Sequence, residues 1–200
     1  METCPGHFGH IALNSPVYHA GMLRYLIKIL KCVCFNCSKI LVCKVSSMAA
    51  AAANEPQKQY DNLKEQEDRE MLLKIKDGKM RFRKVQALAD SIQVCEGEKG
   101  GCGYRQPKYK KLGLSIHIEY RDDNFDNTRD RKETLWPDEA NVVLERISDE
   151  DCRLLGFDPH NCRPDWAIIR NLPVAPPPVR PSVTMSSTMR SEDDLTYAYQ

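Results

Sequence analysis

Four of the nine cysteines in this sequence have the spacing of a metal site. Cys34 and Cys37 form a Cys-x2-Cys pair, in which two thiolates can reach one zinc ion at about 2.3 Å. Cys95 and Cys102 form a second pair among glycines, which permit the positive φ angles of a tight turn. Four thiolates would close a tetrahedral site and leave no position for water, so the zinc would be structural. The 57 residues between the pairs exceed the separation in compact zinc fingers, and a loose set of buried free cysteines is the alternative.

The sequence Cys4-Pro-Gly-His7 offers a second, incomplete set of ligands. Two ligands cannot hold zinc stably, so this half-site either needs another Cys-x2-Cys pair upstream of Met1 or is idle. His10, beside Ile11, is more typical of a packed side chain than of a ligand. The remaining cysteines have no fitting partner and are interpreted as small apolar residues: Cys32, Cys43, Cys152 and Cys162.

Signatures of catalysis are absent from the sequence. It contains no nucleophile elbow, phosphate-binding glycine loop or His-Glu-x-x-His helix. Asp193 and Asp194 are adjacent and would not face each other on a helix, so they are expected at a solvated helix start. The first residues lack the basic and apolar regions of a secretory signal, and no segment is apolar enough to cross a membrane. Clustered cysteines without an oxidising compartment indicate metal ligands rather than disulfides.

Charge is distributed unevenly, although the net charge is only +1. Residues 74–84 carry six bases and one acid, residues 104–111 carry four bases and no acid, and residues 121–151 are strongly acidic. The two basic segments flank the Cys95–Cys102 turn, so one zinc could hold them near each other. They are interpreted either as a weak, non-sequence-specific nucleic-acid surface, with Tyr104 and Tyr109 available for stacking, or as a solvated face that meets another subunit. The candidate nucleic-acid-binding residues are Lys79, Arg81, Arg83, Lys84, Lys108, Lys110 and Lys111, with Lys74, Lys76 and Arg105 beside them.

The elements that must position these residues are mainly helices. Hydrophobic periodicity predicts helices over 16–31 and 137–147, with Ala140, Val143, Leu144 and Ile147 as the apolar stripe of the second. A charged stretch is expected to be helical over 60–76, to break at Asp77–Gly78 and to resume over 79–92. Ser148 is expected to cap a short helix that Gly156 ends. Trp136 occupies a position where a capping Ser or Thr is usual.

Strand patterns are fewer, and the combination predicts an α+β fold. Residues 112–120 alternate apolar and polar side chains, which predicts one half-buried strand. A second strand is expected over 167–172 and extended polyproline over 173–181. The tail at 186–200 is expected to begin a helix, and residues 46–60 are an alanine-rich, low-complexity insertion.

Taken together, the motifs resemble one protein family. The segments CPGHFGHI (4–11), PVYH (16–19) and CVCFNCSK (32–39) resemble the amino-terminal clamp region of the largest subunits of eukaryotic DNA-directed RNA polymerase II. Further similar blocks lie at 75–82, 94–96, 100–103, 106–107, 146–159, 163–166, 172–183 and 192–196. LPVAPPPVRPSV (172–183) and Trp166 favour polymerase II over its paralogues. The alanine-rich insertion, Trp136 and the last four residues depart from the family pattern.

The resemblance implies a zinc-stabilised, irregular clamp core and head, which is mobile over the DNA cleft. One zinc would be held by Cys34, Cys37, Cys95 and Cys102. Cys4 and His7 would complete a second site with an upstream pair. The expected parts are a clamp-core zinc segment (1–45), the insertion (46–60), clamp helices with the second half of the zinc site (61–111), a strand–helix region (112–185) and the start of a truncated helix (186–200).

In this family the chain would serve transcription in the nucleus as part of a nucleotidyltransferase. The resemblance implies other polymerase subunits as partners, notably the second-largest, together with template DNA and the RNA–DNA hybrid, and no membrane. The family's Asn-Ala-Asp-Phe-Asp-Gly-Asp loop, which binds the catalytic magnesium, is absent here, so the chain is expected to hold no catalytic residue. It is interpreted as a fragment truncated at both ends, a truncated gene model or a diverged remnant. The alternative is a free-standing zinc-binding interaction module derived from a polymerase gene.

Overall fold

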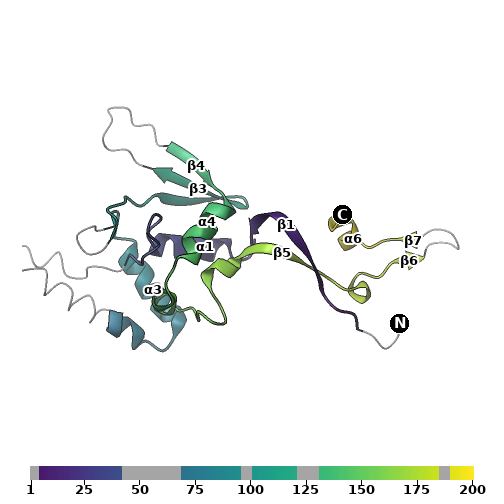
Figure 1. Ribbon diagram of the computed structural model, residues 1–200, viewed down its shortest axis with the longest axis horizontal. Helices are drawn as coiled ribbons and strands as arrows, with labels where there is room; N and C mark the ends of the chain where they lie inside the picture. Colours follow the sequence, from purple (N-terminus) through teal and green to yellow (C-terminus); the bar gives the residue numbers. More distant parts are fainter. Residues whose placement is uncertain (1–4, 42–68, 96–100, 121–130, 185–189) are drawn as a thin grey trace, which may run out of the picture. The chain divides into compact units, whose positions relative to one another are not determined.

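The computed structural model describes residues 5–41, 69–95, 101–120, 131–184 and 190–200 (Figure 1). Helices alternate with small antiparallel sheets, which confirms the predicted α+β class. The chain divides into two compact units, one formed by 18–168 and one by 1–17 with 169–200. Among the described residues, no helix has the length and apolar content needed to cross a membrane.

The larger unit contains most of the helices and one three-stranded sheet. Its elements are α1 (Leu23–Cys32), α3 (Gly78–Ala89), β2 (Lys108–Leu112), β3 (Ser115–Tyr120), β4 (Arg131–Leu135), α4 (Pro137–Glu145), α5 (Asp149–Leu154) and the 3₁₀ helix η2 (Pro164–Ala167). Helix α1 packs against both α3 and β2. Its buried side is formed by Leu23, Leu26, Ile29 and Leu30, at the spacing of one helix face.

The first predicted helix is only partly correct. Residues Gly9–Tyr18 form the strand β1, and α1 begins at Leu23 instead of Pro16. Strand β1 pairs with β5 (Ile168–Val174), a pairing with a distant segment that local periodicity cannot indicate. The last residue of β1 also contributes to the larger unit, because the Tyr18 hydroxyl donates to the carbonyl oxygen of Leu135 at 3.0 Å.

The second helical prediction agrees better with the structure. Residues 69–73 are helical, whereas 60–68 lie outside the described residues. The expected break at Asp77–Gly78 is the start of α3, where the Asp77 carboxylate accepts a hydrogen bond from the backbone N–H of Lys79 at 2.9 Å. A short polar side chain at the N-cap stabilises the first turn in this way.

The predicted strand over 112–120 is in fact a hairpin. Strands β2 and β3 pair antiparallel with Leu112 opposite Ser115, and β4 pairs on the other side of β3. Gly113, with φ +59°, reverses the chain between them. The period-two pattern continues through this turn because Leu112 and Leu114 flank the glycine, yet both are exposed. The residues that do face the core are Tyr109, Ile116, Ile118 and Leu135.

Helices α4 and α5 confirm their predictions. The expected apolar stripe of α4 is buried. The Ser148 hydroxyl accepts from the N–H of Asp151 at 3.1 Å, and Gly156 ends the segment with φ +85°. The backbones of Gly156 and Gly78 lie so close that a Cβ on either residue would overlap the other's carbonyl oxygen. The Trp136 side chain offers no capping oxygen. The backbone N–H of Trp136 instead donates to the Glu139 carboxylate at 3.2 Å.

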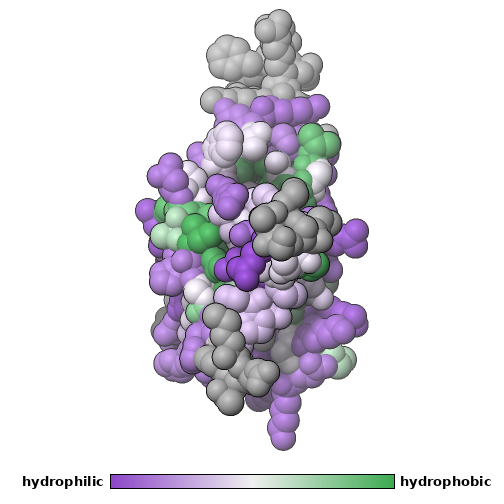
Figure 2. Space-filling model, turned by 90° about the vertical axis from the view of Figure 1, so that its right-hand side faces the viewer, coloured by the Kyte–Doolittle hydropathy of each residue, from purple (hydrophilic) through white to green (hydrophobic). Residues whose placement is uncertain are grey.

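The smaller unit is built from short elements. These are most of β1 and β5, η3 (Pro177–Val179), β6 (Val183–Thr184), β7 (Arg190–Ser191) and α6 (Asp194–Ala198). The predicted extended polyproline over 173–181 is only partly correct: β5 reaches Val174 and Pro176 is extended, but the 3₁₀ turn η3 interrupts the segment. Asp193 caps α6 by accepting from the N–H of Leu195, which confirms the expected helix start. The face in Figure 2 is largely hydrophilic, with apolar side chains in small groups.

Candidate metal centre

The first cysteine pair lies in a tight loop directly after α1. The N–H of Cys34 donates to the carbonyl of Lys39 at 2.8 Å, and the N–H of Ser38 donates back to the carbonyl of Cys34 at 2.9 Å. Ser38 has φ +59°, the left-handed conformation that closes such a turn. The loop thereby directs the sulfur atoms of Cys34 and Cys37 to the same side.

A second loop carries Cys95 and Cys102. It is closed by a β-bridge between Val94 and Arg105, and the N–H of Cys95 donates to the carbonyl of Tyr104 at 2.9 Å. Gly103, with φ +73°, supplies one of the positive φ angles that the sequence led us to expect. Of the other three expected turn glycines, Gly97 and Gly100 lie outside the described residues and Gly101 lies within them.

The two loops bring all four sulfur atoms together. The sulfurs of Cys34, Cys37, Cys95 and Cys102 lie within 4.8 Å of one another, the only such group of potential metal ligands in the part of the chain that the structure describes. Cys34 Sγ is 3.5 Å from Cys102 Sγ, and Cys37 Sγ is 3.7 Å from Cys95 Sγ. Zinc–sulfur bonds of about 2.3 Å at tetrahedral angles place sulfurs about 3.8 Å apart. The donor set and its spacing therefore fit a zinc ion.

Electrostatics also favour a cation at this position. Burial raises the pKa of the Cys95 thiol to about 12, and burial likewise raises the pKa of Cys37. Burial acts in the same direction on Cys102, but hydrogen bonds from the Tyr104 backbone, the Asn36 side chain and the neighbouring cysteines lower its pKa to about 6. Several ionised thiolates are therefore unfavourable in this cluster without a cation, and a divalent cation would compensate their negative charge.

Gln106 links the two loops and was missed as a site residue in the sequence. Its Oε1 accepts from the N–H of Phe35 at 3.0 Å, and its Nε2 donates to Cys34 Sγ at 3.2 Å and to the Tyr104 carbonyl at 3.0 Å. The rings of Phe35 and Tyr104 stack across the loops with centroids 6.3 Å apart. A residue that donates to a ligand sulfur orients the ligand and tunes its charge. The signals in the sequence were its position four residues after Cys102 and its place in the similar block at 106–107.

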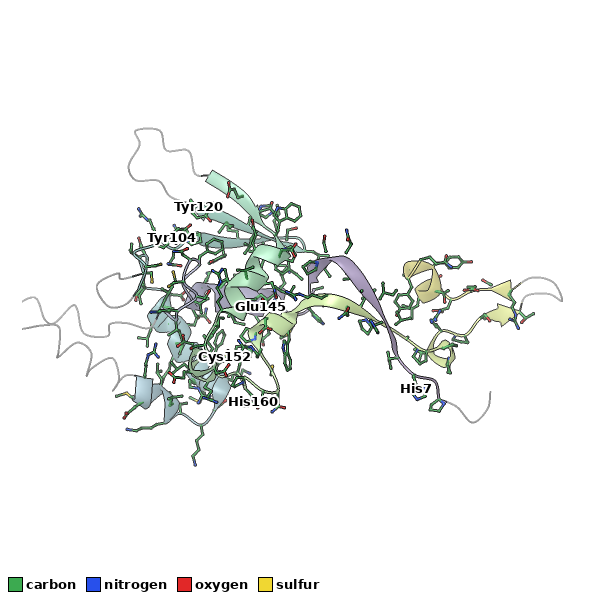
Figure 3. The ribbon with its side chains drawn as sticks, viewed as in Figure 1. His7, Tyr104, Tyr120, Glu145, Cys152 and His160 are labelled. Atoms are coloured by element: carbon green, nitrogen blue, oxygen red, sulfur yellow. The ribbon has the colours of Figure 1, made fainter. Side chains whose placement is uncertain are left out.

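The other predicted ligands and cysteines have different outcomes. His7 is described and exposed, whereas Cys4 lies outside the described residues, so their half-site stays a prediction (Figure 3). Cys32 and Cys152 are buried, as expected of small apolar residues. Cys162 is exposed, so the same prediction is wrong for it, and Cys43 lies outside the described residues. His10 is exposed rather than packed.

The basic residues fall on two surfaces of the larger unit. Lys79, Arg83 and Lys84 are exposed on the first half of α3, whereas Arg81 is half-buried and donates to the carbonyl of Ile75 at 2.8 Å. Lys108, Lys110 and Lys111 are exposed on β2, and Lys110 pairs with Glu119 at 2.8 Å. Tyr109 is buried, so its proposed stacking on nucleotides is wrong.

A cavity of 360 Å³ joins the second basic segment to the end of α3. Its lining includes Lys31, Arg105, Lys108 and Lys110 together with Ala89, the last residue of α3. Because a helix rises about 1.5 Å per residue, Lys79 lies about 15 Å along α3 from that end. The second basic segment thus lies beside the end of α3, whereas Lys79 lies farther along the same helix.

Comparison with known proteins relates the whole sequence to one family. The family model described as RNA polymerase Rpb1, domain 1, matches residues 1–200. The chain is also 44% identical, over 207 aligned residues, to the DNA-directed RNA polymerase II subunit RPB1 of Euplotoides octocarinatus. That alignment covers 100% of this chain and 39% of the relative, so the chain spans about two fifths of the length of the curated protein it matches.

Proposed function

Because this chain belongs to the RNA polymerase Rpb1 domain 1 family, we propose that it serves transcription as part of the largest subunit of RNA polymerase II. The observation that carries the proposal is the match of the whole chain to the family, together with 44% identity to a polymerase II subunit. Nucleotidyl transfer would then be the activity of the assembled enzyme, with its magnesium held outside this chain.

The role of the chain itself is structural. We propose a clamp segment whose cysteine cluster holds one zinc through Cys34, Cys37, Cys95 and Cys102. Four thiolates leave no open coordination position, so the ion would stabilise the fold and would not activate water. A second zinc would involve Cys4 and His7 with ligands from elsewhere in the subunit. The proposed parts of the clamp are a zinc-binding segment (1–45), the helices with the second cysteine pair (61–111) and a strand–helix region (112–185). The insertion at 46–60 separates the first two, and the tail at 186–200 follows the last.

Contact with nucleic acid is proposed to be weak and to depend on charge. The exposed side chains of Lys79, Arg83 and Lys84 on α3, and of Lys108 and Lys111 on β2, can reach phosphates. In the assembled enzyme the partners would be template DNA, the RNA–DNA hybrid and the second-largest subunit, and the location would be the nucleus. A clamp needs only such sequence-independent contacts, because phosphates position the duplex without reading bases.

Isolation of the tagged gene product from its source cells tests this proposal. We expect the second-largest polymerase subunit to co-purify in equal amount, and the complex to synthesise RNA on a DNA template. Recovery of the product alone, with zinc but with no polymerase subunit, would instead support a free-standing zinc-binding module. A product that carries neither zinc nor polymerase subunits contradicts both functions.

A further inference from the structure

A depression of 820 Å³ lies beside the cysteine cluster in the larger unit. Four aromatic residues line it: Phe35, Tyr104, Tyr120 and Trp136. They come from the loop after α1, the second cysteine loop, the end of β3 and the residue before α4. Aliphatic side chains of Ile118, Val142 and Val143 complete its apolar surface. This volume lies within the range of sites that bind organic groups, roughly 300–1,000 Å³.

The aromatic rings are arranged close to one another. Phe35 and Tyr104 stack at an interplanar angle of 30°. Tyr104 also neighbours Tyr120, and Figure 3 shows these two tyrosines next to each other. The loops that hold Phe35 and Tyr104 are the cysteine loops, so the same cluster that would bind zinc also fixes this wall of the depression.

Trp136 has no other evident role at its position. It caps α4 poorly, because its side chain offers no oxygen for the first turn. It adds little to the core, since 63% of the residue is exposed, and Val142 of the same lining is 44% exposed. A large aromatic side chain that is exposed beside other aromatic rings is typical of a recognition surface.

The charges at the depression favour a cation. Its lining contains two carboxylates, Glu133 and Glu139, and one base, Arg146. The pKa of the Tyr120 hydroxyl is raised by burial first, then by Tyr104, and then by the negative charges of Glu133 and Glu139. Both carboxylates therefore act on the interior of the depression. A phosphate backbone would be repelled here, in contrast to the basic surfaces of α3 and β2.

We propose that this aromatic, acidic depression binds an arginine side chain presented by an extended segment of a partner protein. A guanidinium group stacks on aromatic faces and donates hydrogen bonds to carboxylates along its edge, and the depression offers both in one place. Lysine, as a compact point charge, uses the rings less well. This docking site goes beyond the proposed part of the chain in transcription, because it assigns a surface for a partner protein next to the cysteine cluster.

Nuclear magnetic resonance of the zinc-loaded, full 200-residue chain tests the proposal, with the peptide acetyl-Gly-Gly-Arg-Gly-Gly-amide as the probe. The chain contains two tryptophans, and both are exposed. Trp136 lines the depression and Trp166 does not, so Trp166 is an internal control. The Trp166→Phe variant assigns the two indole signals. We expect a saturable shift of the Trp136 indole N–H, no shift of Trp166, and no saturable shift with the neutral isostere citrulline in place of arginine.

Substitutions of the carboxylates separate charge from structure. Glu139→Gln keeps an oxygen that can accept from the backbone N–H of Trp136 but removes the negative charge. This variant should bind the arginine peptide about two- to fivefold more weakly. Asp138→Asn removes the same charge from the same helical turn, outside the lining, and should change the affinity less than Glu139→Gln. Glu133→Gln is the second test if Glu139→Gln fails to fold.

Several outcomes overturn the proposal. These are an unshifted Trp136 signal, equal binding of the citrulline peptide, or equal weakening by Asp138→Asn and Glu139→Gln. A saturable shift of Trp136 with single-stranded oligothymidylate but not with the peptide would assign the depression to nucleic acid instead. The zinc content of each sample is measured separately, so failure of the docking site is distinguishable from failure of the metal centre.

Discussion

Gln106 donates a hydrogen bond from its Nε2 to the sulfur of Cys34 at 3.2 Å, although 72 residues separate the two in the sequence. The same side chain accepts from the next residue of the first loop, Phe35. One amide thus touches both a candidate ligand and the backbone that positions it. This arrangement lets Gln106 support the geometry of the cluster without being one of its four cysteines.

Replacement of Gln106 by alanine should therefore weaken zinc binding without removing a ligand. We expect an affinity about 10- to 100-fold lower, the usual effect of losing such a supporting hydrogen bond. Competition with a chromophoric chelator measures it. Gln93→Ala is the matched control, because Gln93 is exposed and uses its backbone carbonyl to bond Gln106. Equal zinc affinity of wild type and Gln106→Ala would show that the amide plays no part in the site.

A second prediction concerns the close approach of Gly78 and Gly156. Gly156→Ala places a Cβ against the Gly78 carbonyl and forces a non-glycine residue to φ +85°. The strained backbone alone should lower the free energy of unfolding by about 1–3 kcal/mol, and the overlap should add to it. Gly113→Ala is the control, since φ there is +59° but no atom lies within 4 Å of the added Cβ. Urea denaturation of both variants should show the larger loss of stability for Gly156→Ala; equal losses would contradict the close approach of the two backbones.

Nucleic-acid binding by the basic face of α3 should be weak and strongly salt-dependent. Fluorescence anisotropy with a labelled single-stranded oligonucleotide measures it. The triple variant with Lys79, Arg83 and Lys84 changed to alanine should bind more weakly, and the slope of log K against log salt should fall by about 0.7 for each phosphate that is no longer neutralised. Arg153→Ala, an exposed change on α5, should leave the affinity and the salt slope unchanged. Undetectable binding at low salt, or an unaltered slope in the triple variant, would exclude this face as a nucleic-acid surface.

The isolated chain should synthesise no RNA. In the part of the chain that the structure describes, the only cluster of potential metal ligands is the four-cysteine group, which is suited to zinc rather than magnesium. A template-dependent extension assay with the purified chain and magnesium checks this expectation. Nucleotide incorporation above that of a matched Cys34→Ser, Cys37→Ser preparation and a no-protein control would contradict it.

The features that could be predicted from the sequence are those set by local rules. The cysteine pairs lie in tight turns whose backbone conformations depend on a few neighbouring residues, such as Gly103. The stripe of α4, the helix break at Asp77–Gly78 and the cap at Ser148 likewise follow from spacing and from short-range hydrogen bonds. These interactions are complete within one turn or helix, so a local pattern contains the information.

The features that were missed depend on distant segments. Pairing with β5 makes 9–18 a strand, and a glycine turn hidden inside an alternating pattern divides the expected strand at 112–120. The role of Gln106 arises only where the two loops meet, and so does the depression formed by Phe35, Tyr104, Tyr120 and Trp136. Tyr109 was misassigned because alternation in β2 directs it to the core.

Zinc stoichiometry and coordination test the account most directly. The full chain, purified without chelators, should contain one tightly bound zinc whose X-ray absorption spectrum shows four sulfur ligands at about 2.3 Å. Removal of this zinc should loosen both cysteine loops, because binding energy at a structural site is also folding energy. The cysteines concerned, Cys34, Cys37, Cys95 and Cys102, should resist thiol reagents in the native chain until chelator is added. A zinc content near zero, with all four thiols reacting freely in the folded chain, would contradict the proposed metal centre.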